Sequence, residues 1–209
     1  MVQEIPEQFQ KRARIQSLDE YKSMYERSVE NPQEFWREQS RALRWFHEPD
    51  DILTTDHRGE FAWFGGGRLN VAVNCVDRHA SKTPNKVALV WAKNEPGEYE
   101  TITFVDLKGR VGRMANLLKE KGVRRGDRVC VYLPMIPELA VTMLACARIG
   151  AVHSVVFAGF SAEALRDRIL DAGAKVLVTA NESLRGPKKI ALKSIADDAV
   201  EGLSLVEHV

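Results

Sequence analysis

A basic segment between residues 181 and 189 has the side chains of this sequence best suited to bind a ligand. Arg185, Lys188 and Lys189 lie close together in it, with Glu182 as the one nearby acid. Arginine can bind phosphate through two parallel hydrogen bonds, whereas lysine supplies a compact positive charge. The segment follows a predicted strand, and ligands of open parallel sheets bind at the carboxyl ends of strands. From the residues alone, a solvated basic loop is the expected interpretation, and a phosphate-binding site is the alternative.

Other segments with catalytic residue types fit structural roles better. The three glycines at 65–67 lack the Lys-Ser/Thr pair that completes a phosphate-binding loop, so they predict a turn. Ser161 follows a strand and a turn, but no Gly-x-Ser-x-Gly surrounds it, so it predicts a helix cap. The histidines and cysteines are scattered without metal-ligand spacing, which argues against a metal site. These patterns predict no catalytic residue.

Alternating helices and strands must position the basic segment. Apolar residues at helical spacing predict helices, and short apolar runs predict strands. The predicted helices are 107–118, 136–147, 162–172 and 193–200, and the predicted strands are 87–91, 99–104, 128–133, 152–157, 175–179 and 204–209. The first two strands could form a hairpin, and 152–157 is apolar enough for a strand buried on both faces. The pattern predicts an α/β fold: part of a doubly wound, mostly parallel sheet with helices on both faces.

A helical extension is predicted before this sheet. Ser17 and Glu20 have the spacing of a capping box, and Pro32 fits the first turn of a second helix, to which we assign Phe35 and Trp45. The polar run 50–60 predicts a connector. We therefore predict two parts, in the following residues: a helical N-terminal extension, 1–60, and the first part of a large domain, 61–209.

Composition excludes several classes of function. The formal net charge of +1 provides no basic field for nucleic acid or anionic lipid. The longest apolar-rich stretch, 139–156, is interrupted by Arg148 and His153, so no membrane span is predicted. The three cysteines, odd in number and set in apolar runs, predict buried thiols in a reducing compartment and hence a cytoplasmic location.

Several long segments together resemble the acetyl-CoA synthetase group of the AMP-forming acyl-CoA synthetases, in the adenylating-enzyme superfamily. The similar segments are 21–46, 69–79, 101–107, 127–138, 145–157 and 161–169. The match is specific because these are contiguous blocks in the right order. The resemblance implies a ligase in which a carboxylate attacks the α-phosphate of ATP to give an acyl-adenylate, after which the CoA thiol displaces AMP.

The resemblance also implies that this chain is an N-terminal portion. The family's phosphate loop ending in Lys-Gly, its segment for the adenylate and magnesium, and its catalytic lysine all lie downstream of Val209. The predicted strand at 204–209 has no turn after it and would leave an unfinished sheet edge; a short terminal edge strand is the alternative that the pattern leaves open. We therefore expect truncation, no catalytic residue, no resident metal and no ligase activity in this chain alone. Its implied partners are acetate, ATP and CoA, with Mg²⁺ in the whole enzyme, and the C-terminal portion.

The family assigns one partial CoA site to the residues that are present. Arg185 and Lys188 match the positions that contact the 3′-phosphate side of CoA, although the family often has Arg at the second. Phe157, Ala158 and Gly159 match a stretch that lies against the CoA adenine, where the family commonly has Gly instead of Ala158. Phe157 could offer a ring face and Gly159 a close backbone approach.

Two alternatives remain open from the sequence. A propionate-type ligase of the same family would look the same here, because the acid-pocket residues lie downstream. A non-catalytic fragment or binding subunit, from a broken or split ligase, is the third interpretation.

Overall fold

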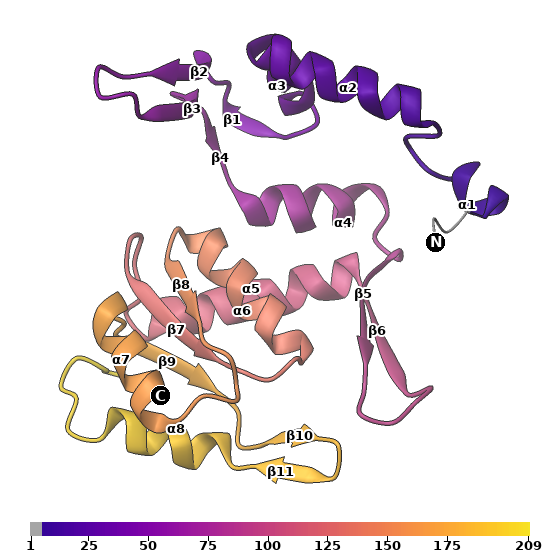
Figure 1. Cartoon of the computed structure of the whole chain (residues 1–209). Helices are drawn as coiled ribbons and strands as arrows, with labels where there is room; N and C mark the ends of the chain where they lie inside the picture. The colour runs from indigo at the N-terminus through magenta and orange to yellow at the C-terminus, as the bar shows by residue number, and fades with distance from the viewer. Residues whose placement is uncertain (1–5) are drawn as a thin grey trace. The chain divides into compact units, whose positions relative to one another are not determined.

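The chain divides into two compact units, and each is described by itself. The computed structural model describes residues 6–209, so the first five residues of the predicted extension lie outside the described part. The first unit extends to Leu69 and the second runs from Asn70 to Val209 (Figure 1). This structural division lies after residue 69. The domain boundary expected at residue 60 from the sequence stays a prediction.

Helices form the first part of the N-terminal unit. They are α1 (Glu7–Gln10), α2 (Leu18–Glu30) and α3 (Pro32–Ser40). The cap at Ser17 is confirmed, because its Oγ accepts the Glu20 N–H at 3.1 Å. The Glu20 carboxylate reaches back one residue further than in a standard capping box and accepts the Gln16 N–H at 2.8 Å. Pro32 begins α3, where its missing N–H removes no helical hydrogen bond.

The N-terminal unit also contains strands that the sequence patterns did not predict. They are β1 (Trp45–His47), β2 (Asp51–Thr55), β3 (Phe61–Gly65) and β4 (Arg68–Leu69), paired as β1 with β4 and β2 with β3. The connector predicted at 50–60 is therefore wrong. One inward apolar residue, Ile52, which is 1% exposed, was too weak a signal for a strand. The assignment of Trp45 to the second helix is also wrong, because α3 ends at Ser40.

Asn70 begins the second unit and joins two helical elements. Its Oδ1 accepts the Ala72 N–H at 2.9 Å and so caps the turn that leads into η1 (Val73–Asp77) and α4 (Arg78–Lys82). Its Nδ2 donates to the carbonyl oxygens of Ala147 and Arg148 at 2.9 and 3.2 Å. One side chain thus satisfies backbone groups at the start of one helical segment and the end of another.

The remaining elements follow the predicted alternation closely. They are β5 (Val87–Ala92), β6 (Tyr99–Thr103), α5 (Phe104–Glu120), β7 (Arg128–Tyr132), α6 (Pro137–Ile149), β8 (Val152–Val155), α7 (Ala162–Ala172), β9 (Val176–Thr179), β10 (Ser183–Arg185), β11 (Lys188–Ile190) and α8 (Leu192–Val200). The predicted β5–β6 hairpin is confirmed. Gly150 and Gly173, with φ of +74° and +60°, end α6 and α7 in the left-handed conformation.

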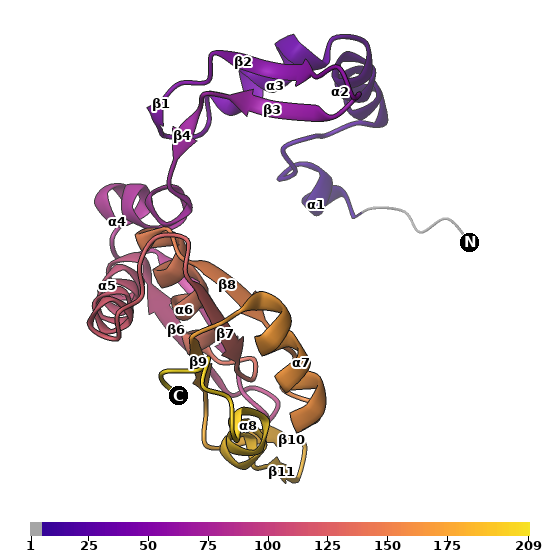
Figure 2. The same cartoon turned by 90° about the vertical axis from the view of Figure 1, so that its left-hand side faces the viewer.

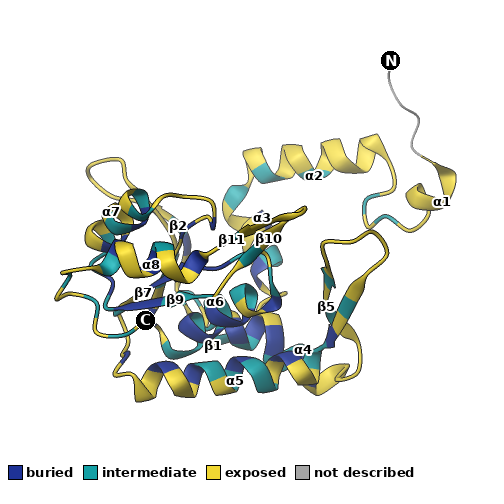
Figure 3. Ribbon diagram, turned by 90° about the horizontal axis from the view of Figure 1, so that it is seen from below, coloured by how far each residue is buried: buried dark blue, intermediate teal, exposed yellow. Residues whose placement is uncertain are grey.

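The central sheet is parallel, and its strand order is β8-β7-β9. Val129 and Val131 of β7 face a core shared with α5 and α6, while Cys130 and Tyr132 face a core shared with α7 and α8. Figure 2 shows α5 and α7 on opposite sides of the sheet, and Figure 3 shows β7 buried between them. The predicted helix-covered sheet is therefore present.

Two predicted strands differ from the observed ones. The run 152–157 gives only the short edge strand β8, in which Val152 and Val155 are exposed, so the prediction of burial on both faces is wrong. The segment 204–209 makes a single parallel bridge, from His208 to Val176 beside β9. Apolar composition did not distinguish an edge strand from a central one.

Candidate functional site

The predicted binding residues lie in segments that follow parallel strands of one sheet. Phe157 follows β8 by two residues, and β10 follows β9 after a short link. The strands β8, β7 and β9 are parallel, so their carboxyl ends meet at one edge of the sheet. The connection after β7 leads to β8, which lies on one side of β7. The connection after β8 then crosses over to β9, which lies on the other side of β7. This reversal of direction beside β7 is the place where open α/β sheets bind ligands.

The basic segment forms a β-hairpin, which the sequence patterns did not predict. β10 and β11 are antiparallel, and Arg185 lies directly opposite Lys188 in their register. Gly186 has a φ of +58° and Pro187 follows it, which fits a tight turn that needs glycine at its first central position. Residues directly opposite each other in a hairpin project from the same face. The structure therefore brings the two predicted phosphate-binding residues together.

The third cation of the segment, Lys189, is the next residue of β11 after Lys188. Successive residues of a strand project to opposite faces, so Lys189 does not share a face with the Arg185–Lys188 pair. It lies opposite Leu184, and its Nζ forms an ion pair with Glu182 at 3.3 Å. Within residues 6–209, no carboxylate lies within ion-pair distance of Arg185 or Lys188. Like charges placed directly across two strands repel each other. The hairpin thus presents an exposed and uncompensated pair of cations.

The turn after β8 presents one exposed ring and one buried methyl group. The Phe157 side chain is 60% exposed, whereas Ala158 is 9% exposed and packs in the core with α7 and α8. A Cβ at Gly159 would lie 2.6 Å from the Phe157 ring. Glycine at this position therefore allows the Phe157 ring to pack against the backbone of residue 159. The Phe160 ring meets Phe157 edge to face at 6.0 Å. From this turn, a ligand could reach the Phe157 ring but only the backbone of Ala158.

Three residues that support these segments were missed in the sequence. The Tyr132 hydroxyl donates to the Phe160 carbonyl at 2.8 Å, and the Arg168 guanidinium lies 4.5 Å from the centre of the Phe160 ring. Asn94, in the loop between β5 and β6, hydrogen-bonds Gly186 at the tip of the β10–β11 hairpin. No local pattern signals a contact between residues 92 positions apart.

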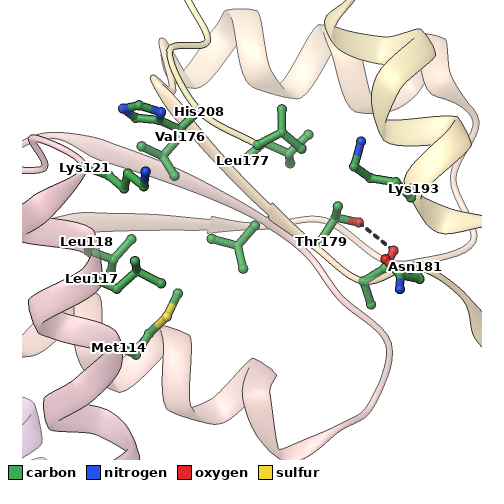
Figure 4. A pocket seen from close by; sticks show the side chains of 13 residues that line it. Met114, Leu117, Leu118, Lys121, Val176, Leu177, Thr179, Asn181, Lys193 and His208 are labelled. Carbon is green, nitrogen blue, oxygen red and sulfur yellow. Dashed lines mark hydrogen bonds between the residues drawn. The ribbon is translucent and has the colours of Figure 1, made fainter.

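A separate pocket of about 260 Å³ lies beside the edge strand β9 (Figure 4). Met114, Leu117 and Leu118 of α5 form its apolar wall. Lys121, Asn181 and Lys193 contribute polar atoms, and His208 lies at its rim. Arg185, Lys188 and the Phe157–Gly159 turn do not line this pocket, and Asn181 is the one residue of the basic segment that does.

The cysteines differ in environment. Cys130 and Cys146 are buried, and desolvation raises the pKa of each thiol from 9.0 to about 11. Both are therefore protonated at neutral pH, as expected for structural thiols. Cys75 is exposed, so the prediction that it is buried is wrong. Among residues 6–209, no three potential metal ligands cluster together, and none of the helices combines the length and the apolar character of a membrane span.

Two family patterns together match most of the chain. Residues 21–75 match the acetyl-coenzyme A synthetase N-terminus, and residues 76–208 match the AMP-binding enzyme family. The acetyl-coenzyme A synthetase of Halorhodospira halophila is 51% identical over 207 residues, which are 98% of this chain and 32% of that protein. The acetyl-coenzyme A synthetase of Emericella nidulans is 51% identical over 90% of this chain and 28% of its own length.

A solved structure supports the same assignment. The acetoacetyl-CoA synthetase of Streptomyces lividans matches with a TM-score of 0.80 and 28% identity, over 88% of this chain and 29% of that one. The chain thus spans about a third of the length of these curated relatives. It belongs to the AMP-binding enzyme family and carries the N-terminal region of the acetyl-CoA synthetase type.

Proposed function

We propose that this chain contributes the N-terminal part of a ligase that forms acetyl-CoA from acetate, ATP and CoA through an acetyl-adenylate. Within it, the β10–β11 hairpin binds the 3′-phosphate of CoA. The observation that supports this phosphate binding is the cross-strand pair of Arg185 and Lys188. Two adjacent cations without a carboxylate partner are matched to a dianionic phosphate, which both can contact from one face of the hairpin.

The turn after β8 would form another wall of the same site. The exposed ring of Phe157 offers an apolar face for the adenine base, and Gly159, without a side chain, allows the ligand to approach the backbone closely. Ala158 contributes its backbone only, because its methyl group is in the core. Both segments follow strands of the parallel sheet, which supports a shared ligand.

ATP and Mg²⁺ would be bound elsewhere in the whole enzyme. Stabilising the charge that develops during adenylyl transfer requires preorganised donors, a cation and a metal ion. The segments expected to supply them lie beyond the third of the relatives' length that this chain spans. We therefore propose that the chain acts with the polypeptide corresponding to the rest of that length, in the cytoplasm, and that alone it is inactive. Acetate-dependent AMP formation by the purified chain, with ATP, Mg²⁺ and CoA, would contradict this.

The ligase proposal can be tested in a chimera. This chain would replace the matching 207 residues of the H. halophila relative, and acetate-dependent AMP release would be measured with and without CoA. An active chimera supports a functional N-terminal portion of a ligase; its preference between acetate and propionate belongs to the relative, which supplies the acid pocket. A folded chimera that forms no adenylate with either acid would argue against a functional N-terminal portion.

The CoA contact can be tested in the same chimera. Arg185→Ala should lower the affinity for CoA about ten- to a hundred-fold, which corresponds to roughly 1.5–3 kcal/mol for a hydrogen bond to a charged group. Lys189→Ala is the matched control. Lys189 lies opposite Leu184 rather than Arg185, and its charge is paired with Glu182. An unchanged Michaelis constant for CoA in Arg185→Ala would refute the assignment.

A further inference from the structure

The loop between β5 and β6 is attached to the tip of the basic hairpin through one side chain. Asn94 Oδ1 accepts the Gly186 N–H at 3.1 Å, and Asn94 Nδ2 donates to the Gly186 carbonyl oxygen at 3.4 Å. The second Nδ2 proton is directed to Glu95 Oε1 at 2.9 Å. The amide therefore binds both backbone groups of a single residue, and Figure 1 shows the two hairpin tips side by side.

Gly186 is the residue on which the geometry of the cation pair depends. It is the first central residue of the turn between Arg185 and Lys188, with a φ of +58°. A change of φ or ψ here changes the distance and the angle between the flanking strands. By holding the N–H and the carbonyl of Gly186 together, Asn94 limits rotation on both sides of this residue.

The β10–β11 hairpin needs such support from outside. Each strand has three residues, and the two strands form a sheet of their own. An isolated two-stranded hairpin is marginally stable in water, and the opposed charges of Arg185 and Lys188 destabilise it further. A phosphate dianion would neutralise this repulsion when bound, but the empty hairpin has to keep its shape against it.

We propose that Asn94 is a positioning residue for phosphate recognition: it holds the Arg185–Lys188 pair in a phosphate-binding arrangement before the ligand arrives. This inference rests on the proposed binding of the CoA 3′-phosphate by the hairpin. Asn94 itself needs no contact with the ligand. Preorganisation of this kind increases affinity because less conformational entropy is lost on binding.

Discrimination between CoA and 3′-dephospho-CoA is the readout that distinguishes positioning from a general loss of structure. Both ligands would be titrated into the ¹⁵N-labelled chain of 209 residues, and dissociation constants would be taken from amide shifts. Asn94→Ala should weaken CoA binding about three- to ten-fold, the effect of losing one or two exposed hydrogen bonds. Its affinity for 3′-dephospho-CoA should not change. Equal loss for both ligands would overturn the proposal.

A second readout needs no ligand. The Gly186 amide donates to Asn94 Oδ1, so its hydrogen exchange should be at least several-fold faster in Asn94→Ala than in the wild type. Glu95→Gln is the control, because it changes the neighbouring carboxylate but keeps both bonds from Asn94 to Gly186. Slow Gly186 exchange that persists in Asn94→Ala would overturn the proposal whatever the ligand result.

Arg185→Ala separates failure of the positioning role from failure of the phosphate site. If Arg185→Ala abolishes discrimination and Asn94→Ala leaves it intact, the hairpin binds the phosphate but Asn94 does not position it. If the wild type binds CoA and 3′-dephospho-CoA equally, the phosphate site itself fails, and the positioning role fails with it. The expected result is reduced discrimination in both variants, with the larger reduction in Arg185→Ala, and no change in Glu95→Gln.

Discussion

The hydroxyl of Tyr132, at the end of β7, donates to the carbonyl oxygen of Phe160 at 2.8 Å. Tyr132 is fully buried, and desolvation raises its pKa above the usual 10.0. The bond joins the central strand of the sheet to the aromatic turn that follows β8. The buried hydroxyl is thereby satisfied, and the turn that carries Phe157 is fixed to the core.

Removing this hydroxyl should destabilise the protein moderately. Tyr132→Phe should lower the free energy of unfolding by about 0.5–1.5 kcal/mol at pH 7, the usual net contribution of a hydrogen bond. Urea denaturation would measure the change. Tyr99→Phe is the matched control, because Tyr99 is 66% exposed and its loss should have no measurable effect. A Tyr132→Phe protein as stable as the wild type would mean that the bond contributes nothing.

The Asp127–Lys175 pair should make stability depend on pH in acid. Lys175 Nζ lies 2.6 Å from the Asp127 carboxylate, and this hydrogen bond, followed by the one from the Arg124 N–H, lowers the pKa of Asp127 below 3.8. A lowered folded-state pKa stabilises the protein above the unfolded value, and this contribution is lost as the pH falls through the folded value.

Asp127→Asn should therefore be less stable than the wild type at neutral pH. The difference between the two proteins should shrink as the pH falls below about 4. Unfolding curves at a series of pH values would show this. Asp167→Asn, on the exposed side of α7, should leave the dependence on pH unchanged, and a constant difference between Asp127→Asn and the wild type would argue against the pair.

Thiol reactivity should separate the three cysteines. Cys75 is exposed and should react with a disulfide reagent in the folded protein, whereas Cys130 and Cys146 are buried and should react only after unfolding. Cys75→Ser should remove the fast phase of labelling. Rapid labelling of all three thiols in the native protein would contradict the buried positions.

The two buried thiols should also make stability depend on pH in alkali. The pKa values of Cys130 and Cys146 in the folded protein, about 11, lie above the ordinary 9.0. The free energy of unfolding should therefore fall as the pH rises from about 9 through 11.

Two leucines of α7 give a matched pair for the core. Leu165 is fully buried and Leu170 is 48% exposed. Leu165→Ala should lower the free energy of unfolding by about 2–5 kcal/mol because it leaves a cavity, whereas Leu170→Ala should change it by less than about 0.5 kcal/mol. Similar losses from both substitutions would mean that α7 does not pack on the sheet as described.

The sequence predicted the second unit better than the first, for a physical reason. In residues 104–200 apolar periodicity is strong because helices and strands pack on two shared cores, and glycines such as Gly150 mark the helix ends. In the first unit α2 has no buried residue, and β2 buries one, Ile52. Weak burial leaves weak periodicity, so these strands could not be recognised.

The candidate site was predictable in composition but not in shape. Arg185 and Lys188 could be selected by charge and by family resemblance. Their cross-strand pairing depends on a short hairpin whose strands are too brief for a periodicity signal. Its contact with Asn94 depends on the tertiary fold, which a local pattern does not contain. The roles of these residues and of Phe157, Ala158 and Gly159 in binding CoA stay predictions.

Successive side chains of β7 point alternately into two cores, and this alternation limits how the length of the strand can change. Val129 and Val131 belong to one core, and Cys130 and Tyr132 belong to the other. Inserting or deleting one residue within this strand would exchange the two sets between the faces. Tyr132 would then point at α5 and α6, far from the Phe160 carbonyl. β7 can therefore vary by substitution, one core at a time, but its length is constrained by both cores at once.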